Sequence, residues 1–175
     1  MTKREEQLVE KAEYVLEHNE SRQFLHRHLS TDCFNKCWAL MEKKNRTPEN
    51  EEDMILLTHT SLWHWKQRDD CQPLNLSIAY WQLGRAYCLA KNTAMAKYYG
   101  QKCVEISTEK SMPPFYVGYG YEVLAHASAL EGNAREAEEY LRLANMELEK
   151  ITIEKNKKLL KADLKKVEQI LNPPV

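Results

Sequence analysis

The chain has 175 residues and a formal net charge of −1, with 43% hydrophobic and 29% charged residues. This composition can fill and cover a single hydrophobic core, which excludes an intrinsically disordered chain. The nearly balanced charge argues against general nucleic-acid binding or a membrane-surface role, because such proteins usually carry a strong basic excess.

The first part of the chain is predicted to form four helices. Apolar residues with helical spacing cover residues 3–18, a short helix covers 22–29, and a third runs from a cap at Thr31 or Asp32 to about residue 44. The triplet Thr47-Pro48-Glu49 then begins a new helix, because Thr can cap it and Pro suits its first position. That helix is expected to continue to about residue 68.

The remaining residues are predicted to form five more helices, at 76–90, 94–108, 115–130, 134–151 and up to 171. Pro113-Pro114 and Gly132-Asn133 mark breaks between them. Five glycines and six prolines are few for this length, which favours helices over many-turned sheets. We therefore predict an all-α fold of stacked antiparallel helical hairpins in one domain, 1–175. Residues 1–30 would be N-terminal helices, 31–150 about three helical pairs, and 151–171 a capping helix.

Two stretches of the sequence resemble each other. The first holds a leucine, a glycine and a tyrosine in one helix and an alanine early in the next: Leu83, Gly84, Tyr87 and Ala96. The second holds a leucine, small residues and a turn glycine in the same order: Leu124, Ala125, Gly132, Ala137 and Ala144. A weaker third copy lies upstream, at Trp38 and Met41. The copies recur every 41 or 42 residues.

These positions resemble the tetratricopeptide repeat, whose pattern begins W-x-x-L-G-x-x-Y and places an alanine in the second helix. Tyr80 stands where the family has tryptophan, and the spacing exceeds the family's 34 residues. The run from His59 to Trp65 is also similar to a segment of uncharacterised bacterial proteins with this repeat fold. That likeness implies the fold and carries no activity.

The resemblance implies that the first helix of each pair lines a concave groove. In this sequence the groove positions are Ile78, Trp81, Arg85 and Cys88, followed by Tyr119, Glu122, His126 and Ala129. Trp81, Arg85, Tyr119, Glu122 and His126 would then share one surface, and aromatic and arginine side chains often concentrate binding energy. The alternative is packing between repeats, with Arg85 and Glu122 as an ion pair. We expect His126, beside a carboxylate, to make binding depend on pH near neutrality.

Metal and cofactor sites are not expected. His59 and His64 lie five residues apart on a helix and diverge, whereas a zinc helix uses a spacing of four. The five cysteines have no framework spacing, so we expect free thiols. No signal peptide or membrane-spanning run is recognisable, which favours a cytoplasmic protein.

The leading functional hypothesis is a non-catalytic binding module that presents its groove to a peptide or protein partner, and not to nucleic acid or a membrane. The alternative is a sensor of a small molecule or signal peptide, with a closed pocket lined by Trp65, Trp81, Arg85 and His126. A distant third is an enzyme with a site at Ser61, His64 and Arg85. The basic C-terminal helix, with seven lysines against three acidic residues between 150 and 171, is interpreted as a solvated capping surface. The alternative is a docking surface for an acidic partner.

Overall fold

The computed structural model describes residues 3–173, apart from the side chain of residue 12; the outermost residues of the predicted domain, 1–2 and 174–175, lie outside this range. Within it the chain forms seven helices and no strand. The helices are α1 (Lys3–Met41), α2 (Pro48–Gln67), α3 (Pro73–Leu89), α4 (Thr93–Glu109), α5 (Pro114–Leu130), α6 (Ala134–Lys150) and α7 (Glu154–Leu171). None of them, over the residues described, is long and apolar enough to cross a membrane. The predicted all-α class is confirmed.

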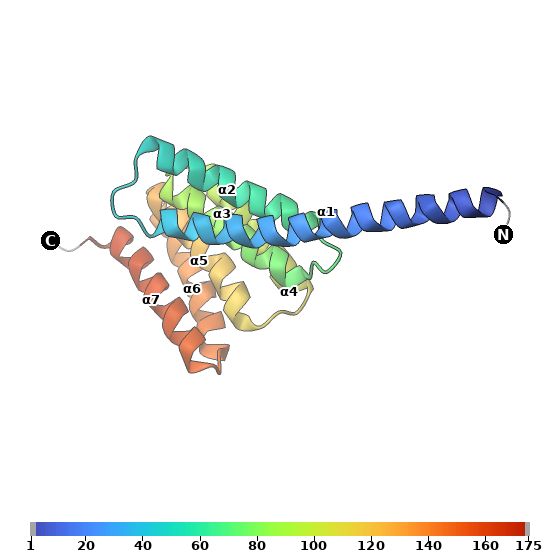
Figure 1. Cartoon of the computed structure of the whole chain (residues 1–175). Helices are drawn as coiled ribbons and strands as arrows, with labels where there is room; N and C mark the ends of the chain where they lie inside the picture. The colour runs from blue at the N-terminus through green and yellow to red at the C-terminus, as the bar shows by residue number, and fades with distance from the viewer. Residues whose placement is uncertain (1–2, 174–175) are drawn as a thin grey trace.

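Consecutive helices pack against each other along the chain, and the odd-numbered helices also touch (Figure 1). Helix α3 contacts both α1 and α5, and α5 in turn contacts α7. Helices α1 and α7 form no packing contact over the described residues, and they lie on either side of the face that α3 and α5 connect. Because the described parts of α1 and α7 do not pack against each other, a cavity can open between them over α3 and α5.

Helix α1 corrects the prediction of three separate N-terminal helices, because it is one helix from Lys3 to Met41. The polar residues taken as breaks do not interrupt it. Ser30 and Thr31 turn their hydroxyls back to the carbonyl of Arg27, at 3.0 Å each, so they are satisfied inside the helix. With no Gly or Pro between residues 3 and 41, nothing stops the helix.

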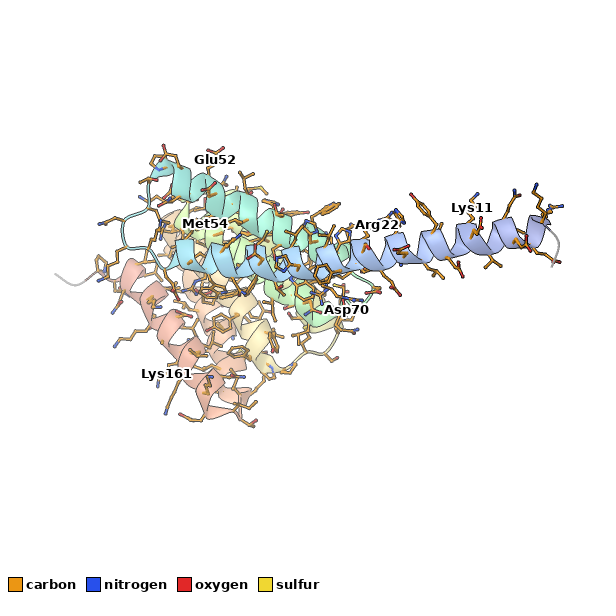
Figure 2. The ribbon with its side chains drawn as sticks, in the orientation of Figure 1. Lys11, Arg22, Glu52, Met54, Asp70 and Lys161 are labelled. Atoms are coloured by element: carbon orange, nitrogen blue, oxygen red, sulfur yellow. The ribbon has the colours of Figure 1, made fainter. Side chains whose placement is uncertain are left out.

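The N-terminal part of α1 projects beyond the other helices (Figures 1 and 2). We call residues 3–22 the arm, and every side chain described in it is exposed. The packed part begins near His26, which is buried, and continues through Cys33 and Cys37 against α2. The boundary near residue 30 is therefore absent from the backbone, and burial changes instead at about residue 23.

The turns after α3 and α5 have the same construction, 41 residues apart. Lys91 and Gly132 both take a positive φ, at 56° and 76°, and end the helix in the left-handed region. Asn92 and Asn133 then accept hydrogen bonds from the backbone N–H three residues on, which caps the next helix. Local chemistry thus explains why two hairpins form here.

Small residues bring these hairpins into close contact. A Cβ added to Gly84 would meet Val123 Cγ1 at 2.5 Å, so α3 and α5 touch where no side chain fits. The repeat register predicts that six of its residues are buried, including Tyr87. Five of them are buried, namely Leu83, Ala96, Leu124, Ala137 and Ala144. The expectation for Tyr87 was wrong. It is only half-buried, because its hydroxyl reaches His59 Nε2 at 2.8 Å near the surface.

Candidate functional site

A partly enclosed cavity of about 350 Å³ opens on the face between α1 and α7. Half of its lining residues are aromatic, namely Trp38, Trp81, Phe115, Tyr116 and Tyr119. The others are Ser77, Ile78, Cys103, Leu159 and Asp163. Helices α1, α3, α4, α5 and α7 each contribute, so segments far apart in the sequence build the site.

The aromatic rings form a continuous wall. Trp81 is central, with its ring 5.5 Å from that of Trp38 and 5.2 Å from that of Tyr119. Phe115 extends the wall edge-to-face, 4.9 Å from Tyr119. Such tilted and edge-to-face contacts stabilise the rings against one another and leave an apolar surface toward the cavity. The site is therefore suited to apolar groups.

Local sequence explains the wall on α5. Pro114 opens this helix, and its fixed φ suits the first helical position. Phe115 and Tyr119 are four residues apart, so they lie one above the other on the same face of the first turns. On α3, Ile78 and Trp81 are three residues apart and share a face in the same way. The start of α5 at Pro114 thus places both rings in its first turns, beside the cavity.

A small polar patch lies beside the aromatic wall. Ser77 Oγ is 2.7 Å from Ser107 Oγ and 3.6 Å from Cys103 Sγ. Burial raises the pKa of Cys103 to about 11, so its thiol is protonated at neutral pH. A protonated thiol is a poor nucleophile, and this cysteine serves packing.

A charge cluster backs the wall and joins three helices. Arg85 of α3 lies 3.6 Å from Glu122 of α5 and donates to Asp163 of α7 at 3.3 Å. The Tyr119 hydroxyl donates to the other Asp163 oxygen at 3.0 Å. Lys166 also reaches Asp163, at 2.7 Å. The guanidinium is therefore engaged by two carboxylates and is not free for an anionic ligand.

The ionisation of the cluster follows from burial and from these pairings. Burial, partly offset by Arg85, raises the pKa of Glu122 above its ordinary value. Burial alone would also raise the pKa of Asp163, but Arg85 and Lys166 outweigh it and lower that pKa. Burial opposes the charge of Arg85, yet Glu122 and Asp163 outweigh it and raise the Arg85 pKa. The charges compensate one another, so the cavity presents little net charge.

The cluster also contains polar atoms without a regular hydrogen bond. Over the described residues these include Trp81 Nε1, Arg85 Nη1 and Glu122 Oε2, all buried. The Trp81 indole still lies close enough to Glu122 to favour the ionised carboxylate. Imperfectly paired buried groups cost free energy and are few in native proteins.

His126 corrects one expectation. Its Nδ1 lies 3.9 Å from Glu122, as the four-residue spacing predicts. Burial, together with the positive charge of Arg85, lowers the His126 pKa to about 4. The ring is neutral at neutral pH, so the expected titration near neutrality was wrong. The nearby carboxylates do not offset the effect of burial on the His126 pKa.

The structure brings together the five residues that were predicted to share one surface. Trp81 and Tyr119 line the cavity, whereas Arg85, Glu122 and His126 lie behind its wall. Ile78, also assigned to the groove, lines the cavity, whereas the groove residues Cys88 and Ala129 are buried. The resemblance therefore predicted that these residues lie together, but it assigned to the groove several side chains that lie behind the cavity wall or are buried.

His64 and Trp65 lie apart from this site, on α2. His64 Nδ1 is 2.8 Å from His26 Nδ1 across the contact with α1. Trp65 packs beside Leu62 and Leu83 and is covered by the guanidinium of Arg68, 3.8 Å from the ring centroid. The expected pocket lined by Trp65, Trp81, Arg85 and His126 is therefore not formed.

The proposed catalytic group of Ser61, His64 and Arg85 is not assembled either. Ser61 Oγ donates to the Ser30 carbonyl at 2.7 Å, while His64 and Arg85 have the separate partners described above. Across residues 3–173, no three His, Cys, Asp or Glu side chains gather where they could hold a metal ion. The five cysteines all carry free thiols.

Sequence reasoning missed much of the lining. Asp163 entered only the net charge of the C-terminal helix. A single aspartate in the middle of a lysine-rich helix could have indicated a buried ion pair with another helix. Trp38 was noted as part of a weak repeat, and that position pointed to the groove. Phe115, Tyr116 and Leu159 gave no signal beyond being apolar.

Comparisons with protein-family models, curated proteins and solved structures found no match to the chain.

Proposed function

We propose that this chain is a non-catalytic binding module of the tetratricopeptide type, whose cavity receives an apolar part of a peptide or protein partner. The observation that carries the proposal is the aromatic cavity on the face between α1 and α7. Exposed apolar surface in a concave site is costly in water, and it usually marks a binding site. We place the module in the cytoplasm, because its five free thiols favour a reducing compartment.

Several features support the repeat assignment. The two turns that end α3 and α5 repeat with the same 41-residue offset as Leu83 and Leu124. Gly84 lies close to the backbone of α4, with an added Cβ 3.3 Å from the Ala96 carbonyl oxygen, where the family places small residues. The cavity is lined mainly by the first helix of each pair and by α7. The family uses the same helices to form its groove.

The lining chemistry specifies the kind of ligand. A volume of about 350 Å³ lies near the lower end of known ligand sites, so it suits one or two large apolar side chains. Asp163 is the charged residue among the lining groups, and Arg85 and Lys166 neutralise it. We therefore expect an uncharged apolar anchor, such as a leucine, methionine or phenylalanine on a helical peptide.

Selection of displayed peptides on the full chain tests this function. Selected peptides should carry closely spaced apolar residues. Leu159→Lys should weaken their binding at least about tenfold, as measured by calorimetry, because it puts a charge at the cavity. Leu159 is 47% exposed, so the substitution should leave the fold intact. Ile153→Lys is the matched control, since Ile153 is 61% exposed and does not line the cavity.

Two results would contradict peptide binding. One is selection of no peptide, and the other is equal binding to the wild-type and Leu159→Lys chains. If no peptide is selected but indole or naphthalene raises the melting temperature of the wild-type chain and not of Leu159→Lys, the same cavity serves a small-molecule sensor.

A further inference from the structure

Among the described residues, no other helix covers the side chains of the arm of α1, which are all exposed. A helix of about 20 residues is only marginally stable in water unless something packs on it. Large apolar side chains on the arm are nevertheless 45–63% exposed, at Leu8, Val9, Val15 and Leu16. With successive residues about 100° apart, these four fall on one side of the helix. The arm therefore has an uncovered apolar stripe.

An acidic row runs beside this stripe. Its members follow spacings of four, three, four and three residues: Glu6, Glu10, Glu13, Glu17 and Glu20. Between residues 5 and 20 there are six glutamates and one lysine, a net charge of −5. Like charges at these spacings repel each other and destabilise a free helix. A basic partner would remove that repulsion, whereas a second arm would double it.

Helix α7 carries the complementary surface. Leu159, 47% exposed at the cavity, and Ile170, 39% exposed, are two apolar positions on one side of this helix, and Asp163 and Lys166 lie between them. Lys158, Lys161 and Lys165 form a basic row beside these positions, with spacings of three and four residues. Lys161 and Lys165 are exposed and have no ion-pair partner among the described residues. Glu154 and Glu168 flank the basic row, and Glu154 pairs with Lys158, so Lys161 and Lys165 provide the unpaired positive charge opposite in sign to the acidic row of the arm.

The lengths of the two surfaces also agree. At about 1.5 Å per residue, the arm spans roughly 30 Å and the 18 residues of α7 roughly 27 Å. The arm cannot reach α7 of its own chain, because α1 is one continuous helix and the arm projects away from the body. Figure 2 shows Lys11 and Lys161 at opposite ends of the molecule. The partner surface must come from another molecule.

We propose that the arm of one copy of this chain docks along α7 of a second copy, with its apolar stripe over Leu159 and its acidic row against Lys158, Lys161 and Lys165. The inference rests on the proposed function, because Leu159 also lines the aromatic cavity. In this proposal the partner that binds at the aromatic cavity is the acidic, amphipathic arm of another copy of the same chain. A reciprocal pair would bury both arms about a twofold axis.

Sedimentation velocity of the full chain tests the proposal. The wild-type chain should self-associate, and association should weaken as salt rises from about 0.05 M to about 0.5 M. Glu13→Lys with Glu17→Lys on the arm, or Lys161→Glu with Lys165→Glu on α7, should each weaken self-association at least about tenfold. Mixing the two charge-reversed proteins should restore association, because every contact in the mixed pair again joins opposite charges.

The controls separate this inference from its alternatives. Lys44→Glu with Lys110→Glu changes the net charge equally on other exposed surfaces and should leave association unchanged. If the arms paired with each other, Glu13→Lys with Glu17→Lys would strengthen association, which would overturn the proposal. A wild-type chain that stays monomeric at every concentration would also overturn it. In that case peptide binding abolished by Leu159→Lys would leave the proposed function intact.

Discussion

The arm of α1 and the hairpin of α5 and α6 are both regularly helical, but they differ in how much tertiary packing stabilises them. Helix α5 is enclosed by α3, α4, α6 and α7, and nine of its 17 residues are buried. The arm buries none of the side chains described in it. Helix α5 is rich in glycine and alanine, which let neighbours approach, whereas the arm alternates glutamates with exposed apolar groups. Helical periodicity alone therefore does not reveal which helix belongs to a core.

Leu124→Ala should have the largest effect on this comparison. Leu124 is 2% exposed, so the substitution removes buried apolar surface and leaves a cavity, costing about 2–5 kcal/mol of unfolding free energy. Urea denaturation followed by circular dichroism measures the loss. A change below about 1 kcal/mol would show that α5 is packed more loosely than described.

Gly84→Leu tests the close contact of α3 with α5. A Cβ at this position already meets Val123 Cγ1 at 2.5 Å, so the larger side chain should overpack the contact and cost about 1–3 kcal/mol. Thermal unfolding compares it with Gln101→Leu, an exposed site on α4. An unchanged midpoint for Gly84→Leu would contradict the register of these helices.

His126 should make the stability of the hairpin region depend on pH. Its folded pKa of about 4 lies below the ordinary 6.5, so the unfolded chain binds this proton more readily. The stabilisation is complete above about pH 6.5 and should fall by about 2 kcal/mol as pH drops toward 4. Glu122 acts in the opposite direction, since its raised pKa favours proton uptake by the folded chain.

Denaturation of the wild-type and His126→Gln chains across this pH range separates the two groups. Glu122 is common to both proteins, so the difference between the two curves reports His126. Parallel curves would mean that His126 is solvated and titrates normally.

An asparagine can be replaced by alanine in both regions. Asn133→Ala removes the side chain that caps α6 and should cost about 1 kcal/mol. Asn19→Ala, in the exposed arm, removes no cap and should leave stability within about 0.5 kcal/mol. Equal losses would mean that the arm is as firmly structured as the hairpin.

The smallest effect is expected for Leu16→Ala. Leu16 is 63% exposed, so the monomer measured at low concentration should change by less than about 0.5 kcal/mol. At higher concentration the same variant should associate more weakly than the wild-type chain in sedimentation velocity. A loss comparable with that of Leu124→Ala would show that the arm folds back onto its own chain.

Local sequence determined the helices from α2 to α7 and the turns between them. Pro48, Pro114, Asn92, Gly132 and Asn133 act within one turn of their own positions, so their effects can be read residue by residue. The resemblance to the tetratricopeptide repeat also implied that Trp81, Arg85, Glu122 and His126 would lie together. These four residues belong to α3 and α5, whose register is fixed by the buried Gly84 and Leu124.

Tertiary structure alone decided the membership of the cavity and the ionisation of its cluster, and it selected the continuity of α1 that the absence of Gly and Pro allows. Ser30 and Thr31 can either cap a helix or bond back within one, and only the packing of α1 on α2 selects the second. Asp163 joins Arg85 and Tyr119 across 78 and 44 residues of sequence, a distance over which no local pattern carries information. The pKa of His126 depends on how much solvent its neighbours exclude. The four-residue spacing of the sequence predicted its contact with Glu122, whereas the fold determines how far its ring is buried.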